Sequence, residues 1–128
     1  MKLPRANKLV VVIDDDPLVL EATEGLLRSW GCQVVAAESC DHAIKMLSVI
    51  GRRPDFIVCD HRLPVGPTGA DTIEILRNAF QIPALLISAD EASLQIEADL
   101  GSCYTLRKPV NVAAFRAAYA PWDFTLAE

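Results

Sequence analysis

The chain has 128 residues, of which 52% are hydrophobic, and it carries a formal net charge of −5. That length fits one domain, and the apolar fraction is sufficient for a sizeable core. The acidic balance without a basic block argues against nucleic acid as a partner, and no uncharged apolar run reaches the roughly 18 residues of a membrane span. The N-terminal residues lead into a strand pattern rather than a secretory leader, so we expect one cytoplasmic domain.

Apolar, β-branched segments alternate with helical patterns along the chain. This alternation is typical of βα units around a parallel sheet that is buried on both faces. The pattern predicts an α/β fold: a doubly wound, five-stranded parallel sheet with five helices distributed over its two faces. The predicted strands are Leu9–Ile13, Gln33–Ala37, Phe56–Cys59, Ala84–Ile87 and Tyr104–Arg107.

The first two helices have clear start and stop signals. The first follows an Asp16 cap, has Pro17 in its first turn and ends at Gly31. Its predicted inner face is Val19, Thr23, Leu26 and Trp30. The second begins near Ser39 or Asp41 and stops at Gly51. Its predicted inner face is Ala43, Ile44, Leu47 and Ile50.

The later helices differ in how well they are marked. The third is predicted over roughly 70–80, with Ile73, Leu76 and Phe80 facing inward. A fourth, with a weaker pattern, lies between residues 90 and 101. The fifth starts at an Asn111 cap, passes through Val112, Phe115 and Tyr119, and ends before Pro121.

The cysteine and histidine residues give no sign of a metal or redox motif. The four cysteines lie far apart without a CxxC pair, which favours small buried hydrophobic side chains in a reducing compartment. They are Cys32, Cys40, Cys59 and Cys103. His42 and His61 lack zinc-ligand spacing, so we expect His42 on a helix surface and assign His61 no chemical role.

Polar side chains follow four of the five predicted strands. Asp14 and Asp15 come after the first strand, Asp60 after the third, Ser88 after the fourth and Lys108 after the fifth. Ligands of open parallel sheets bind at the carboxyl ends of the strands, beside a switch in strand order. The five residues therefore form one candidate site.

Taken one by one, these residues have ordinary structural explanations as solvated loop acids, a helix cap or a surface lysine. Together they do not, because two unit charges about 4 Å apart cost on the order of 4 kcal/mol at an effective dielectric of 20. Lys108 or a divalent cation should offset that repulsion. Mg²⁺ typically takes one or two carboxylates, which fits Asp15 and Asp60, with Asp14 acting directly or through water.

Four segments in this order resemble the receiver domains of bacterial two-component phosphorelays: "VVIDDDP", "PDFIVCDHRLP", "PALLISAD" and "LRKPV". The likeness spans about Lys8 to Tyr119. It implies a flavodoxin-like receiver fold with strand order 2-1-3-4-5, in a single domain of residues 1–128 whose tail is 120–128. "DHRLPVGPTG" and "LRKPV" are most similar to receivers at the C-terminus of hybrid sensor histidine kinases.

The resemblance also implies roles for the site residues. Asp60 would be the phosphoacceptor, and Mg²⁺ would bind Asp14, Asp15, Asp60 and the backbone carbonyl of Arg62. Ser88 would donate to the phosphoryl group, and Lys108 would pair with one of its oxygens.

The resemblance further implies a signalling phosphoprotein that catalyses only its own phosphorylation and dephosphorylation. Its phosphoryl donor would be a histidine kinase or a histidine phosphotransfer protein. Its output would pass to a downstream protein, a kinase domain or a second copy of the chain.

Three alternatives stay open at this point. One is an interaction module that no longer accepts phosphate, and retention of all the acidic, hydroxyl and lysine positions counts against it. Another is a fragment of a hybrid kinase. The third is a flavin carrier or small-molecule enzyme on the same fold, although three aspartates after the first strand would repel a flavin phosphate.

Some positions depart from the family pattern. Thr105 stands where the family often has an aromatic residue, and the neighbouring Tyr104 should lie on the opposite face of its strand. The segment from Asp60 to Gly69 is one residue longer than usual and rich in turn formers. Arg62 and Asp90 border the phosphate in the family and are candidates for tuning its lifetime.

The tail has an alternating apolar pattern in Trp122, Phe124 and Leu126. We expect it to pack on its own domain, with a partner protein or a second protomer as the alternative.

Overall fold

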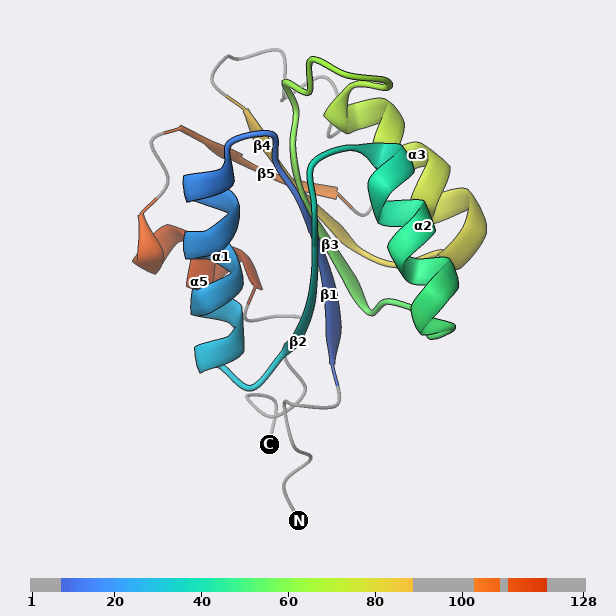
Figure 1. Ribbon diagram of the computed structural model, residues 1–128. Coiled ribbons are helices and arrows are strands. Elements are labelled where there is room, and N and C mark those ends of the chain that lie inside the picture. Colours follow the sequence, from blue (N-terminus) through green and yellow to red (C-terminus); the bar gives the residue numbers. More distant parts are fainter. Residues whose placement is uncertain (1–7, 89–102, 109–110, 120–128) are drawn as a thin grey trace.

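Five parallel strands form one central sheet in the order β2-β1-β3-β4-β5 (Figure 1). The computed structural model describes residues 8–88, 103–108 and 111–119. The strands are β1 Leu9–Ile13, β2 Gln33–Ala37, β3 Phe56–Asp60, β4 Ala84–Ser88 and β5 Cys103–Arg107. The predicted parallel sheet and the strand order implied by the family resemblance are confirmed.

The described helices lie in two layers, one on each face of the sheet (Figure 1). The first layer contains α1 Pro17–Ser29 and α5 Val112–Tyr119, and the second contains α2 Cys40–Ile50 and α3 Gly69–Phe80. Successive side chains along a strand point to opposite layers. Val10 and Val12 pack with Leu27 of α1, whereas Val11 and Ile13 belong to the other core cluster. The sheet is therefore buried on both faces, as its continuous apolar strands predict.

Three strand boundaries differ from prediction by one residue. β3 continues to Asp60 and β4 to Ser88, because parallel pairing with the neighbouring strands extends through these polar residues. β5 begins at Cys103 rather than Tyr104. Such shifts are ordinary at element ends. The predicted fourth helix, at 90–101, lies outside the described residues.

The first helix is capped as predicted, but its inner face was predicted only in part. The Asp16 side chain accepts a hydrogen bond from the Leu18 backbone at 3.0 Å. Leu27 is fully buried, whereas Val19 is 39% exposed, so the prediction that Val19 faces inward is wrong. Apolar residues occur in adjacent pairs along this helix, so the sequence alone left the phase of the buried stripe ambiguous. The stripe runs through Leu20, Leu27 and the predicted Leu26 and Trp30.

The second helix begins after a Ser39 cap and ends at Gly51, which has a left-handed φ of 68°. Its inner face was predicted only in part. Ala43 and Leu47 are buried, but Ile44 and Ile50 are 39% and 48% exposed, so their predicted burial is wrong. Ile44 lines a groove between α2 and α3 rather than the core.

The remaining described helices agree with prediction. In α3, Ile73 and Leu76 are buried and Phe80 packs against the same cluster. Ahead of α5, the Asn111 side chain accepts from the Ala114 backbone at 2.7 Å. The Phe115 ring then meets the Trp30 ring edge-on, with the centroids 5.8 Å apart, which ties α5 to α1.

The three cysteines whose side chains are described, Cys32, Cys40 and Cys59, are buried, as expected. The side chain of Cys103 and the tail from residue 120 lie outside the described part of the structure. None of the described helices combines the length and apolar content needed to cross a membrane.

Candidate functional site

Three aspartates from two neighbouring strands meet at the carboxyl edge of the sheet. Asp14 and Asp15 follow β1, and Asp60 is the last residue of β3, which pairs directly with β1. One carboxylate oxygen from each lies within 4.8 Å of the other two. Asp14 and Asp60 are each only 4% exposed, whereas Asp15 is exposed. The predicted gathering of these acids is confirmed.

Backbone hydrogen bonds fix the position of Asp14. Its amide donates to the Ala37 carbonyl at 3.1 Å, which continues the contact between β1 and β2. Its Oδ1 accepts from the Asp16 amide at 2.9 Å. Burial raises the pKa of Asp14, and repulsion from Asp60 and Asp15 adds to that rise, while the Asp16 amide and Lys108 act to lower it.

Lys108 reaches the phosphoacceptor candidate directly. Its Nζ lies 3.2 Å from Oδ2 of Asp60, forming an ion pair in which the aspartate side chain is buried and the lysine side chain is 40% exposed. The Lys108 amide donates to the Ser88 carbonyl at 2.9 Å and so holds the lysine at the end of β5, next to β4. The lysine is therefore part of the site rather than an isolated surface residue.

Ser88 and Arg62 complete the predicted set. Ser88 is the last residue of β4 and is 2% exposed, one position beyond Ile87, which pairs with Asp60. The Arg62 amide approaches Oδ1 of Asp60 at 3.4 Å, and the residue itself is exposed. The structure thus places both residues at the edge where the acids meet.

Sequence reasoning missed the importance of Gly69. Its amide donates to the His61 carbonyl at 2.8 Å, which brings the start of α3 back against the end of β3. A Cβ atom at Gly69 would overlap the carbonyl oxygen of Asp60 and lie 2.5 Å from Cα of His61. Only glycine lets α3 begin this close to Asp60. The turn-forming "VGPTG" stretch was the sequence signal, but it does not show which glycine makes the contact.

The strand register of β5 places Thr105. It pairs with Leu86, which belongs to the core beneath α2 and α3, so the Thr105 side chain faces that layer. The side chain of Tyr104 lies outside the described part of the structure.

The residues present fit a magnesium ion. Carboxylate oxygens are the ligands that Mg²⁺ prefers, and three of them converge here. Three aspartates gather beside the Lys108 ammonium in a partly buried site, so the acidic groups outnumber this cation. A divalent cation would offset that excess.

Replacing Asp14 by asparagine is expected to raise the free energy of unfolding at about pH 7 without divalent cations. The pKa of Asp14 in the folded state is raised above the ordinary 3.8. As the pH rises from the unfolded-state pKa through the higher folded-state pKa, ionisation of Asp14 lowers the free energy of unfolding. Below the unfolded-state pKa this cost is absent. In urea titrations, the increase in unfolding free energy of Asp14→Asn over the wild type should shrink as the pH is lowered toward about 4.

Asp15→Asn is the matched control, because the exposed Asp15 carboxylate should affect stability much less. A lower free energy of unfolding for Asp14→Asn at neutral pH would contradict the assignment of Asp14 as a costly buried charge.

Doubly wound sheets of this order, with acids and a lysine at the carboxyl edge, are typical of signalling domains that carry a phosphoryl group on an aspartate. The family model of the response regulator receiver domain matches residues 10–120. The chain belongs to this family. It is a receiver domain of two-component phosphorelay signalling, and Mg²⁺ binding and phosphorylation are general features of such domains.

Two curated relatives are named as regulators. The chain is 32% identical over 111 residues to the transcriptional regulatory protein KdpE of Mycobacterium tuberculosis, covering 85% of this chain and 48% of that protein. It is 30% identical over 114 residues to the Regulator of RpoS of Escherichia coli, covering 87% of this chain and 33% of that protein. The chain thus spans less than half the length of both relatives.

Among solved structures, a response regulator receiver protein from Sinorhizobium medicae matches with a TM-score of 0.78 and 26% identity. The match covers 90% of this chain and 93% of that one.

Proposed function

We propose that the chain accepts a phosphoryl group on Asp60 from a phosphohistidine, in a reaction that requires Mg²⁺. The observation that carries the proposal is the pairing of buried Asp60 with Lys108 at 3.2 Å, beside Asp14 and Asp15. A nucleophilic carboxylate, a cation for the transferred group and a set of metal ligands are thereby present in one place.

In the proposed reaction, a carboxylate oxygen of Asp60 attacks phosphorus as the phosphorus–nitrogen bond of phosphohistidine breaks. The imidazole leaves with the electron pair of that bond, and the product is an aspartyl phosphate. Mg²⁺, when bound, neutralises charge on the phosphoryl oxygens; Asp14, Asp15, Asp60 and the Arg62 carbonyl are the groups that would hold it. The Lys108 ammonium, already at Asp60, would pair with a phosphoryl oxygen.

The new group would change the charge and the hydrogen bonding at the ends of β4 and β5. Aspartyl phosphate adds negative charge and acceptor oxygens within reach of this edge. Ser88 would donate to it, and Lys108 would shift its pairing from the carboxylate to the phosphoryl group. These changes would bias the segments that follow β4 and β5, which is how we propose that the signal is passed on.

We propose a histidine kinase or a histidine phosphotransfer protein as donor, in the cytoplasm. A donor must bring its histidine to Asp60, so it must contact the surface beside the acids. A groove between α1 and α5 opens there, and both Asp14 and Lys108 line it. Its apolar walls are formed by Val19, Leu26, Val112 and Phe115. An apolar surface next to the reacting carboxylate suits a protein donor.

The single-domain organisation, with a core of about 8–119 and a tail of 120–128, is part of the same proposal. A place at the C-terminus of a hybrid kinase rests on the resemblance of the "DHRLPVGPTG" and "LRKPV" segments.

Incubation with acetyl phosphate tests the proposal without a donor protein. With Mg²⁺, intact-mass measurement should show a gain of one phosphoryl group, and excess EDTA should suppress it because the acids alone repel the incoming phosphate. An unchanged mass with Mg²⁺ would favour the interaction module that does not accept phosphate. An equal gain in mass with EDTA would show that phosphorylation does not require Mg²⁺.

A further inference from the structure

The groove between α1 and α5 is large and has apolar walls that reach the surface. The two helices lie side by side in one layer (Figure 1), and the volume between them is about 860 Å³. Of its apolar lining residues, Val19 is 39% exposed and Val112 is 58% exposed. Valine side chains contribute favourable free energy when they leave water, so this groove has an energetic reason to be covered.

The chain that follows α5 starts from one wall of this groove. α5 ends at Tyr119, and the nine residues after it, 120–128, have the sequence "APWDFTLAE". Val112 lies seven residues before Tyr119, which is roughly 10 Å along the helix axis at the rise of an α-helix. Nine extended residues span up to roughly 30 Å. The tail is therefore long enough to turn back and follow the groove to its far end.

The pattern of the tail suits an extended segment that lies on an apolar groove. Pro121 opposes continuation of the helix. Alternate side chains of an extended chain point to the same side, so Trp122, Phe124 and Leu126 would form one apolar face. The residues between them, Asp123 and Thr125, are polar and would form the opposite face, toward water.

The charge at the far end of the groove also suits the tail. Asp14 and Lys108 line that end, and Asp14 is 4% exposed whereas the Lys108 side chain is 40% exposed. The ammonium is therefore the more accessible of these two charges. Glu128 continues the alternation of the apolar tail residues, so its carboxylate would approach this ammonium.

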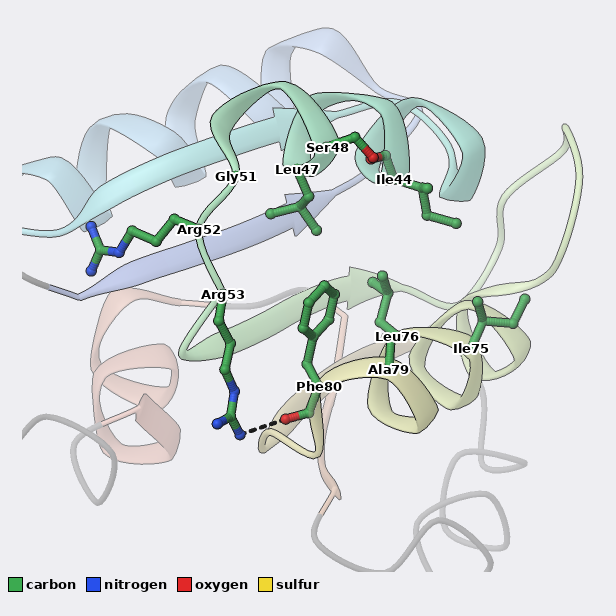
Figure 2. Close-up of a pocket in the computed structure, with 10 residues that line it drawn as sticks. All are labelled: Ile44, Leu47, Ser48, Gly51, Arg52, Arg53, Ile75, Leu76, Ala79 and Phe80. Atoms are coloured by element: carbon green, nitrogen blue, oxygen red, sulfur yellow. Dashed lines mark hydrogen bonds between the residues drawn. The ribbon is translucent and has the colours of Figure 1, made fainter.

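A second apolar groove, between α2 and α3, lies on the opposite face of the sheet (Figures 1 and 2). Figure 2 shows Ile44 of α2 and Ile75 of α3 at one end of it. A tail that leaves α5 starts in the other layer and would have to pass around the sheet to reach these residues. Position in the fold thus favours the α1–α5 groove.

We infer that the tail, residues 120–128, lies in the α1–α5 groove of its own domain, with Trp122, Phe124 and Leu126 against the apolar walls. Covalent attachment to α5 gives the tail a local concentration that is typically in the millimolar range for a short linker. A free partner at ordinary cellular concentrations does not have this advantage.

The inferred position has a consequence for signalling. A phosphoryl donor that docks on the α1–α5 groove has to displace the tail first, so the tail would limit access to Asp60. This consequence rests on the proposed function, whereas the position of the tail does not. The tests below use the unphosphorylated chain without Mg²⁺ or a donor, so their failure is distinct from a failure of phosphorylation.

Methyl NMR of the full chain tests the position directly. Nuclear Overhauser contacts should join the rings of Trp122 and Phe124 to the methyl groups of Val19 and Val112. The double variant Trp122→Ser with Phe124→Ser should lose these contacts and shift the same valine methyl resonances, because the ring currents are removed.

Ile44 and Ile75 provide the internal control for this experiment. They are 39% and 41% exposed, about as much as Val19, but they line the groove in the other layer. Their methyl resonances should be the same in the wild type and in the double variant.

A change in the groove provides a second, independent measurement. In a Trp30→Phe background, Trp122 is the sole tryptophan of the chain, and its fluorescence should be protected from quenching by acrylamide. Val112→Asp places a charge against the apolar face of the tail and should remove this protection. Val49→Asp is the matched control, because Val49 is 88% exposed on α2. Thermal unfolding of each variant checks that the domain is folded.

Three results would overturn the inference. One is a tail whose rings contact other methyl groups, or none, as expected if a partner protein is the occupant of the groove. A second is a set of valine contacts that disappears on dilution, which would mean that the tail of a second copy occupies the groove. The third is a folded Val112→Asp variant in which Trp122 stays as protected as before.

Discussion

Asp60→Asn is expected to abolish phosphorylation by acetyl phosphate in the presence of Mg²⁺. The amide nitrogen and oxygen of asparagine replace a carboxylate that is 4% exposed and paired with Lys108, so the shape of the site is preserved while its nucleophile is lost. The other two acids are not substitutes, because Asp14 is held by the Asp16 amide and Asp15 is exposed to solvent. Intact-mass measurement should show no phosphoryl group on the variant.

Asp55→Asn is the matched control for this change. Asp55 is a partly buried acid near the opposite edge of the sheet, where its Oδ2 accepts from the Leu9 amide at 2.8 Å. Its replacement should leave phosphorylation intact. Phosphorylation of Asp60→Asn at the wild-type rate would show that another residue is the acceptor.

Gly69→Ala is expected to have the largest effect on stability among single-methyl changes. The added Cβ meets backbone atoms of Asp60 and His61, which cannot rotate away as a side chain would. Overpacking of this kind costs roughly 1–3 kcal/mol of unfolding free energy. Either α3 or the end of β3 must move, so phosphorylation of Asp60 should slow as well.

Gly25→Ala in α1 adds the same methyl group where no atom lies within 4 Å. Because alanine has a higher helix propensity than glycine, the unfolding free energy of this control should rise by about 0.5–1 kcal/mol. Urea denaturation of both variants gives the comparison. A Gly69→Ala variant as stable as wild type would show that α3 can begin elsewhere without disturbing Asp60.

The sheet was predictable because central parallel strands appear in the sequence as short continuous apolar runs. Two of the five strands have the predicted bounds, and the others shift by one residue where Asp60, Ser88 and Cys103 pair with a neighbouring strand. The site was predictable for the same reason, since residues at the carboxyl ends of adjacent parallel strands must lie together.

Features that depend on packing between distant segments were not predictable from the sequence. The phase of α1 was ambiguous because adjacent apolar residues offered two possible faces, and only the packed sheet selects Leu27 over Val19. Periodicity predicts Ile44 as a core residue, yet it is 39% exposed and lines the groove between α2 and α3. Gly69 was missed because its constraint comes from the backbone of Asp60, nine residues away in sequence.

The most direct test of the central claim is to locate the phosphoryl group on the wild-type chain. Borohydride reduction after incubation with acetyl phosphate converts an aspartyl phosphate into homoserine, and peptide mass spectrometry then identifies the modified position. We predict homoserine at position 60 when Mg²⁺ is present and unmodified aspartate there when EDTA replaces it. Modification at another aspartate, or at position 60 to the same extent without Mg²⁺, would contradict a metal-dependent acceptor formed by Asp14, Asp15, Asp60 and Lys108.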